Sequence, residues 1–361
     1  MKHTSLHGIH AESKASLVPF ADWEMPLSYA GTAQEVLAVR TTAGIFDVSH
    51  MGEVRITGPG AKDFIQRVCS NDVNKLRDRR AQYSLLLNPQ GGVIDDVIVY
   101  RFNQSEYLVV VNAGCKTKDL LWLEAQANGL DGVILTDESY ITALIAVQGP
   151  KAFQFVQSVS NEAALSAMGR FDFRPCELAD QATIVSRTGY TGEDGFEIFC
   201  AWDAAPSIWQ AFIEVGCVPA GLGARDVLRL EAAYPLYGHE LDETHSPYSS
   251  GVAWAVKPNK GSFIGRDKCI ESAQNGSDGV LIGLKTLTKA IPRQGCLIYS
   301  DKNSSPCGIV TSGTLSAVVG TGIALARVNT TVQTSEKLQI DIRGRRTLAE
   351  IVALPFFRNG V

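Results

Sequence analysis

The sequence predicts an α+β protein that consists of a duplicated α/β unit followed by a small β-rich domain. Two segments, at residues 54–68 and 145–159, each read as a strand, a Gly-Pro turn and a helix. Each is followed by a strand-rich stretch with a glycine-containing turn, at residues 82–112 and 183–200. From about Gly279 onward, short apolar runs alternate with Gly, Ser, Asn and Asp. This spacing is typical of a β-barrel or a β-sandwich.

The two strand–turn–helix segments correspond to each other at individual positions. The matched pairs are Gly58-Pro59 with Gly149-Pro150, Ala61 with Ala152, Phe64 with Phe155, and Val68 with Val159. Proline suits the first position of a helix, which places both helix starts at the Gly-Pro turns. Because a strand, a Gly-Pro turn and a helix also form a common local arrangement, two matches alone do not establish a duplication. We predict a sheet with helices on one face for each half.

The predicted domain boundary lies in a polar, glycine-bearing stretch at residues 272–279. Such composition is typical of linkers. We therefore expect one module at residues 1–275, with repeats that start near residues 54 and 145, and a C-terminal β-domain at residues 279–361.

The composition favours an ordinary globular protein and excludes several classes. The chain has 361 residues, 45% of them hydrophobic and 20% charged, and a net charge of −5, which does not indicate nucleic-acid binding. No apolar run approaches membrane-spanning length, and the N-terminus does not resemble a secretory signal. The eight cysteines are scattered without a Cys-x-x-Cys pair, and the six histidines show no paired metal spacing. We expect buried, reduced thiols, no metal site and a cytoplasmic location.

A Gly-Gly turn that leads into an apolar strand is the most informative local feature. Residues 88–100 read Asn-Pro-Gln-Gly-Gly-Val-Ile-Asp-Asp-Val-Ile-Val-Tyr. A carboxylate in such a strand must be paired, hydrogen-bonded or functional, because burying it alone is costly. Successive strand residues face opposite sides, so Asp95 and Asp96 cannot both point into one pocket. One of the two is a candidate for chemistry, and strand alternation does not say which.

Two further polar residues stand in unusual positions. Glu197 lies between Phe196 and Ile198 in an apparent strand, where it could accept two N–H bonds from a planar ligand or form a structural ion pair with an arginine. Arg225 lies in the first turn of a helix that ends near Pro235, where the helix dipole disfavours a cation. It shares a helix face with Arg229, four residues on. The turn before this helix lacks the dinucleotide-binding fingerprint.

Aromatic residues recur near these polar elements. They are Tyr83, Tyr190, Trp254 and Phe357. Planar ligands favour such neighbours, although most aromatic residues simply fill cores. The acids Glu193 and Asp194 lie in a glycine-rich turn, where we expect them to be solvated.

Taken together, the motifs resemble the aminomethyltransferase, or T-protein, family of the glycine cleavage system. The resemblance covers nearly the whole chain. It rests on Pro-Phe-Ala-Asp-Trp-Glu-Met-Pro-Leu at 19–27, Gly-Ile-Phe-Asp-Val-Ser-His-Met-Gly-Glu at 44–53, Gly-Gly-Val-Ile-Asp-Asp at 91–96, Ser-Arg-Thr-Gly-Tyr-Thr-Gly-Glu-Asp-Gly-Phe-Glu at 186–197, Gly-Leu-Gly-Ala-Arg-Asp at 221–226 and Phe-Phe-Arg-Asn-Gly at 356–360. Asp22 stands where the family usually has glycine, and Phe357 where it often has tyrosine.

The resemblance implies a cloverleaf of two intertwined α/β units around a central folate site, with a C-terminal β-barrel. The implied reaction transfers the methylene of an aminomethyl group on the dihydrolipoyl arm of the lipoylated H-protein to tetrahydrofolate. Its products are 5,10-methylenetetrahydrofolate, ammonia and dihydrolipoyl H-protein, and it needs neither a metal nor a flavin. Two relatives that share the folate module are alternatives: a non-catalytic folate-binding protein of the iron–sulfur repair type, and a folate-dependent demethylase module.

The resemblance also assigns expected roles to individual residues. It selects Asp96 as the acid beside the reacting folate nitrogens, and it places Glu197 on the pterin amide and amino edge. The remaining expected folate-site residues are Met51, Tyr83, Asn112, Tyr190, Arg225 and Trp254. The locally basic run at residues 257–268 is our candidate for H-protein docking through Lys257 and Lys260, although such a run is usually only a solvated face.

Overall fold

The computed structural model describes residues 1–160, 163–277, 279–300, 305–333 and 337–358. Asp278 of the predicted linker, and Asn359 and Gly360 of the closing motif, lie outside these residues. The chain divides into two compact units, one of Met1–Ser84 with Asp96–Arg225 and the other of Leu85–Asp95 with Asp226–Val361. The boundary that we predicted near residues 275–279 remains a proposal about domains. Among the described helices, none has the length and apolarity needed to cross a membrane.

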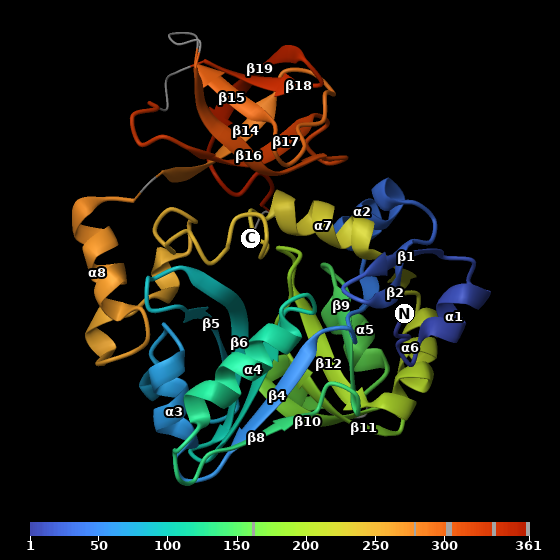
Figure 1. Ribbon diagram of the computed structural model, residues 1–361. Coiled ribbons are helices and arrows are strands. Elements are labelled where there is room, and N and C mark those ends of the chain that lie inside the picture. The colour runs from blue at the N-terminus through green and yellow to red at the C-terminus, as the bar shows by residue number, and fades with distance from the viewer. Residues whose placement is uncertain (161–162, 278, 301–304, 334–336, 359–361) are drawn as a thin grey trace. The chain divides into compact units, whose positions relative to one another are not determined.

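The first large sheet carries the Asp-Asp strand. Its strand order is β5-β6-β7-β4-β8, and β4 pairs antiparallel with both β7 and β8. Helix α3 packs against β7 and α4. Helices α3 and α4 lie next to each other in Figure 1. The elements are β4 (Gly52–Thr57), α3 (Ala61–Val68), β5 (Arg80–Leu87), β6 (Val93–Asn103), β7 (Glu106–Val111), α4 (Lys116–Ala127) and β8 (Ile134–Asp137).

The second large sheet carries Glu197. Its strand order is β10-β11-β12-β9-β3-β13, and α5 and α6 pack on β9 and β12 (Figure 1). Phe196, Ile198 and Trp209 belong to the apolar core that these helices and the sheet enclose. The elements are β3 (Gly44–Asp47), β9 (Thr142–Gln148), α5 (Ala152–Ser158), β10 (Phe173–Leu178), β11 (Gln181–Ser186), β12 (Gly195–Ala201), α6 (Ala205–Glu214) and β13 (Val218–Pro219).

The two halves are duplicated and intertwined. The predicted strand–turn–helix segments are β4 with α3 and β9 with α5. Strand β3, which precedes β4 in the chain, belongs to the second sheet, where it lies between β9 and β13. The α+β class with a duplicated unit is therefore confirmed. The predicted helix starts were slightly wrong, because the helices begin at Ala61 and Ala152, two residues after Pro59 and Pro150.

The N-terminal segment forms a two-stranded antiparallel ribbon, β1 with β2, flanked by two helices. These elements are α1 (His7–Glu12), β1 (Ser16–Phe20), β2 (Trp23–Ser28) and α2 (Thr32–Thr41). Asp22, at the departure from the family pattern, has a φ of 68° in the tight connection between the two strands. Aspartate tolerates this left-handed conformation better than most residues, although less well than glycine.

The C-terminal strands close into the predicted barrel (Figure 1), in the order β14-β17-β16-β15-β18-β19. The sequence reasoning missed β19, whose residues alternate less clearly between apolar and polar. Part of the predicted linker was also wrong, because residues 272–275 continue helix α8. The elements are α8 (Arg266–Asn275), β14 (Val280–Thr286), β15 (Leu297–Ser300), β16 (Pro306–Leu315), β17 (Gly322–Val328), β18 (Leu338–Ile342) and β19 (Arg345–Val352).

Helix α7 (Leu222–Glu231) begins after the predicted glycine-rich turn and ends four residues before Pro235. Arg229 is almost fully buried and donates to Asp226, to Glu240 and to the hydroxyl of Ser312. Five short 3₁₀ helices are described elsewhere in the chain. They are Val73–Lys75, Ala163–Ala167, Trp202–Ala204, Ala253–Ala255 and Pro258–Lys260.

The Gly-Gly turn requires both of its glycines. Gly91 has a φ of 84°, in the left-handed region that glycine tolerates best. At Gly92 a Cβ atom would overlap the carbonyl group of Glu243. That carbonyl accepts a hydrogen bond from Asn88 Nδ2 at 2.9 Å, so the turn is fixed against this neighbouring loop. The start of β6 is thereby held in register.

Candidate functional site

Asp96 is held by the amide of Asn112. The Nδ2 of Asn112 donates to Asp96 Oδ1 at 2.9 Å and to the Asp96 carbonyl oxygen at 3.1 Å. The register of β4, β7 and β6 aligns Glu53 with Val110 and Val110 with Ile98. Extending this register by one same-face step places Asn112 opposite Asp96 and puts Met51, in the bend just before β4, at the same level. Three predicted site residues thus share one line across the first sheet.

The face that carries Asp96 packs against the second sheet. Tyr100, four residues after Asp96 and on the same face, forms edge-on contacts with Phe173 and Phe199, at centroid distances of 5.3 and 5.2 Å. Its hydroxyl lies 3.4 Å from Oγ1 of Thr188. Tyr100 is fully buried, and burial raises the pKa of its phenol. This side chain therefore fills the space between β6 and the second sheet.

Glu197 points to the same space from the second sheet. Its neighbours Phe196 and Ile198 enter the core under the helices, so Glu197 and Phe199 face the other way, toward Tyr100. Thr188 Oγ1 donates to Glu197 Oε2 at 2.5 Å and also lies 3.0 Å from Ser186 Oγ. The carboxylate is therefore oriented by the loop after β11. The other oxygen, Oε1, is available for a ligand's N–H donors.

Arg225 and Tyr190 form the third part of the candidate site. The guanidinium carbon of Arg225 lies 5.0 Å from the centroid of the Tyr190 ring, a favourable cation–π distance. Burial lowers the pKa of Arg225, and the negative charge of Glu197 opposes this effect. Among the residues that the structure describes, the buried Nη1 atom of Arg225 has no hydrogen-bond partner. An anionic ligand would satisfy this donor.

The other predicted site residues are Tyr83, Trp254, Lys257 and Lys260. Tyr83 is half-buried on β5, the strand beside β6, and its carbonyl oxygen accepts from Asn71 Nδ2. Trp254 is 58% exposed on a short 3₁₀ helix of the second unit. Lys257 is exposed, and the ammonium of Lys260 lies 4.9 Å from the centroid of the Phe263 ring. Their assigned roles remain predictions.

Sequence reasoning missed Glu53, a buried acid on the same face as Asp96. It lies one same-face row from the Met51–Asn112–Asp96 line and is 0% exposed. Within the described part of the chain, neither of its carboxyl oxygens has a hydrogen-bond partner. Burial raises the pKa of Glu53 well above its usual value, and the charges of Asp137 and Glu138 add to the effect while Lys116 opposes it. A Gly-Glu pair at the start of a strand does not predict that the glutamate side chain is buried.

Replacing Glu53 with glutamine should change how stability depends on pH. The folded protein holds the Glu53 proton more tightly than the unfolded chain does. The contribution of this protonation to the free energy of unfolding is complete below the unfolded pKa of about 4.3, and it is lost as the pH rises toward the folded pKa. The free energy of unfolding of Glu53→Gln, relative to that of the parent chain, should therefore rise by about 1.4 kcal/mol per pH unit between these two pKa values. Urea unfolding between pH 5 and pH 8 measures it.

The matched control is Glu177→Gln, which changes an exposed acid on β10. Its free energy of unfolding should follow the pH profile of the parent chain. Parallel profiles for the parent chain and Glu53→Gln would show that Glu53 is ionised when folded.

Two further residues differ from expectation or were not predicted. Glu193 was expected to be solvated, but it is buried and pairs with Arg40 at 2.8 Å. The turn that contains Glu193 folds back onto α2, so this acid is not solvated although it lies in a glycine-rich turn. His50, next to Met51, is buried, and burial lowers its pKa to about 4, so its imidazole is neutral at physiological pH. Nothing in the sequence pattern marks His50 as buried.

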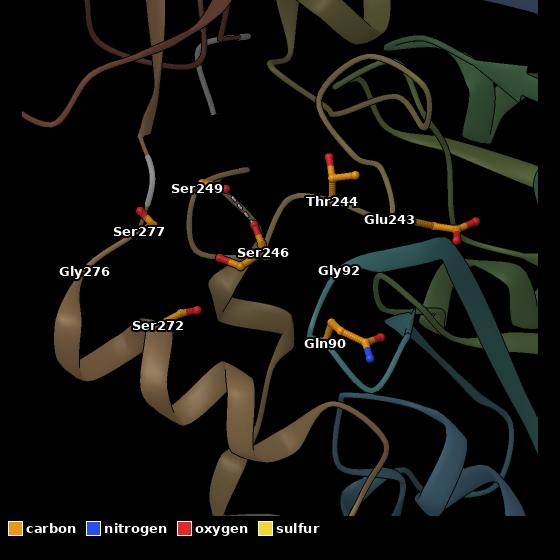
Figure 2. Close-up of a pocket in the computed structure, with 9 residues that line it drawn as sticks. All are labelled: Gln90, Gly92, Glu243, Thr244, Ser246, Ser249, Ser272, Gly276 and Ser277. Atoms are coloured by element: carbon orange, nitrogen blue, oxygen red, sulfur yellow. Dashed lines mark hydrogen bonds between the residues drawn. The ribbon is translucent and has the colours of Figure 1, made fainter.

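A separate polar cavity of about 230 Å³ lies in the second unit, beside the Gly-Gly turn. Figure 2 shows its lining: Gln90, Gly92, Glu243, Thr244, Ser246, Ser249, Ser272, Gly276 and Ser277. None of the predicted site residues lines this cavity. Its walls lack the aromatic and apolar surface that a planar heterocycle needs. We therefore assign the candidate site to the inter-sheet face and not to this cavity.

Comparisons with known proteins match nearly the whole length of the chain. Residues 6–260 match the family model of the GCVT N-terminal domain, and residues 280–358 match that of the glycine cleavage T-protein C-terminal barrel domain. The chain is 44% identical to an aminomethyltransferase of Chloroherpeton thalassium and 42% identical to one of Geobacillus thermodenitrificans, with 99% of each chain covered in both cases. It also matches the crystal structure of the glycine cleavage system aminomethyltransferase T of Bartonella henselae, with a TM-score of 0.92 and 29% identity over 99% of this chain and 98% of that one.

Proposed function

The chain belongs to the glycine cleavage T-protein family of aminomethyltransferases, and on this premise we propose its reaction and the roles of its site residues. The reaction takes the methylene of an aminomethyl group on the dihydrolipoyl arm of an H-protein and passes it to tetrahydrofolate. The products are 5,10-methylenetetrahydrofolate, ammonia and the dihydrolipoyl H-protein. The observation that carries the proposal is the pair of acids, Asp96 and Glu197, that face one space from opposite sheets.

Asp96 is the acid that we assign to the reacting centre. The acceptor nitrogens of the folate each lose a proton in the reaction, so a fixed carboxylate beside them stabilises the positive charge that develops there. Asn112 donates two hydrogen bonds to Asp96, one to the side chain and one to the main chain, which restricts the carboxylate to one orientation. Such pre-organisation is what electrostatic stabilisation requires.

Glu197 and Arg225 are the groups that we assign to folate binding. The free oxygen of Glu197 suits the amide and amino edge of the pterin, which presents adjacent N–H donors. The unsatisfied Nη1 of Arg225 suits an anionic part of the ligand, such as the glutamate tail. Met51, Tyr83 and Tyr190 are the walls that we propose for the ring system. No step assigned to these residues calls for a bound metal or a flavin.

An ammonia-release assay tests this function. The protein is incubated with aminomethylated H-protein, with and without tetrahydrofolate, and ammonia is measured together with methylenetetrahydrofolate. Release that depends on both substrates is the expected result, and it excludes the non-catalytic binding alternative. Formation of methylenetetrahydrofolate from an N-methyl amine, when a flavin dehydrogenase is added to oxidise the amine to its iminium, and without turnover of aminomethylated H-protein, would instead support the demethylase alternative. Folate binding without ammonia release under any condition would contradict the proposal.

Charge reversal of the proposed docking lysines should weaken the use of H-protein. Lys257→Glu with Lys260→Glu should raise the KM for aminomethylated H-protein several-fold at low salt, and less at high salt, because exposed charges are screened. The kcat and the folate affinity should not change. The control is Lys285→Glu with Lys289→Glu, at the same net charge on the barrel unit. A KM equal to that of the parent chain at low salt would remove this docking assignment.

A further inference from the structure

The N-terminal segment brings three metal-binding side chains together. Nε2 of His7 lies 2.6 Å from Oε2 of Glu24, and Nε2 of His3 lies 3.5 Å from the same oxygen. The three donor atoms lie within 4.8 Å of one another. The two imidazole rings stack with centroids 3.7 Å apart and planes inclined by 9°. Their Nε2 atoms both lie near Oε2 of Glu24. Sequence reasoning predicted no metal site because it found no paired histidine or cysteine spacing, and Glu24 lies far from the two histidines in the chain.

The backbone holds these side chains in place. Lys2 donates to the Asp22 carbonyl at 2.8 Å and accepts from the Glu24 amide at 2.9 Å, which aligns the N-terminal segment with β2 and puts His3 beside Glu24. His7 opens helix α1, whose fully buried His10 lies 2.9 Å from Asp47. His7 and Glu24 are thus held on ordered elements, and His3 follows the paired backbone of Lys2. Two fixed ligands reduce the conformational entropy that is lost when an ion binds.

The donor set fits a particular class of ion. Two imidazoles and a carboxylate suit Zn²⁺ and neighbouring transition metals, whereas Mg²⁺ and Ca²⁺ prefer oxygen ligands alone. Tetrahedral bonds of about 2.0–2.2 Å place the ligand atoms roughly 3.3–3.6 Å apart. The His3–Glu24 separation of 3.5 Å already matches, and the His7–Glu24 separation of 2.6 Å is that of a hydrogen bond whose proton an ion would replace.

Access to the site is also favourable. The side chain of His3 is 53% exposed, whereas those of His7 and Glu24 are 22% and 27% exposed. The stack holds the two nitrogen lone pairs in nearly parallel planes, so the exposed ring of His3 must turn out of the stack for both nitrogens to bind one ion. Solvent on its open side supplies a water molecule as the fourth ligand, which completes a tetrahedral set.

We propose that His3, His7 and Glu24 form a binding site for one divalent transition-metal ion of the Zn²⁺ class, which joins the N-terminal segment to β2. The site contains none of the residues assigned to the folate reaction, so it is independent of the proposed function. Its effect is on the stability of the N-terminal segment.

Isothermal titration of the metal-stripped, tag-free full chain with ZnCl₂ at pH 7.5 tests the site. The expected result is an ion bound by the parent chain with an affinity that falls at least tenfold in His7→Ala and in Glu24→Gln. The matched control is His245→Ala. His245 is a partly exposed histidine whose Nδ1 lies 2.7 Å from Asp242 Oδ2, a single histidine–carboxylate pair without a second imidazole. This control should bind Zn²⁺ as the parent chain does.

Thermal unfolding supplies a second measurement. Equimolar ZnCl₂ should raise the Tm of the parent chain and of His245→Ala, but not that of His7→Ala or Glu24→Gln, and MgCl₂ should raise none of them. Glu24→Gln keeps the size of the side chain, so it carries the test if His7→Ala folds poorly. The proposal is overturned if the parent chain does not bind Zn²⁺ at micromolar concentration, or if Glu24→Gln and His7→Ala bind it as tightly as the parent chain.

Discussion

Asp96→Asn should lower the turnover of aminomethylated H-protein by roughly one to three orders of magnitude while folate affinity changes little. The substitution preserves size, and its amide oxygen can still accept the hydrogen bond that Asn112 Nδ2 now donates to Asp96. What it removes is the negative charge at the position that we assign to the reacting nitrogens. A loss confined to kcat is the signature of an interaction made mainly in the transition state.

Steady-state kinetics with saturating folate, together with folate titration calorimetry, measures the two quantities separately. The neighbouring variant Asp95→Asn is the control, because Asp95 lies on the opposite face of the strand and is fully buried. It should alter the Tm more than the kcat. If Asp96→Asn turns over at the parent rate with both substrates saturating, Asp96 has no electrostatic role in the reaction.

The duplicated architecture could be predicted because its signals are local. Each half repeats a strand, a Gly-Pro turn and a helix within fifteen residues, and the barrel strands follow one another with turn residues between them. The sequence did not predict that β3 belongs to the second sheet. β3 has four residues, and its partners β9 and β13 are far away in the chain. Pairings of this kind are decided by tertiary packing, which a window of sequence does not contain.

The same distinction applies to the candidate site, where some features follow from the local sequence and others depend on distant strands. Strand alternation placed Asp95 and Asp96 on opposite faces of the strand, and the strand that contains Glu197 was also expected. The partners Asn112 and Thr188 come from the ends of other strands, so the orientation of each acid depends on register. The burial of Glu53 depends on register too. Its neighbouring charges at Asp137 and Glu138 are supplied from more than eighty residues away.

Glu197→Ala should weaken folate binding by roughly ten- to a hundredfold. A hydrogen bond to a charged group contributes about 1.5–3 kcal/mol, and each 1.4 kcal/mol is a tenfold change in affinity. The substitution also removes the negative charge that supports the partly buried Arg225, so the cation that we assign to the anionic part of the ligand becomes more costly to hold. Both consequences act on binding, so the KM for folate should rise more than the kcat falls.

Two companion variants separate a ligand contact from a structural role. Thr188→Val removes the 2.5 Å hydrogen bond that orients Glu197 but leaves its charge, so its effect on folate affinity should be smaller than that of Glu197→Ala. Glu177→Ala, on the exposed side of the same sheet, should bind folate as the parent chain does. Calorimetry on folded samples gives the affinities. An unchanged folate affinity in Glu197→Ala would mean that Glu197 only supports Arg225, and that the pterin edge is bound by other donors and acceptors.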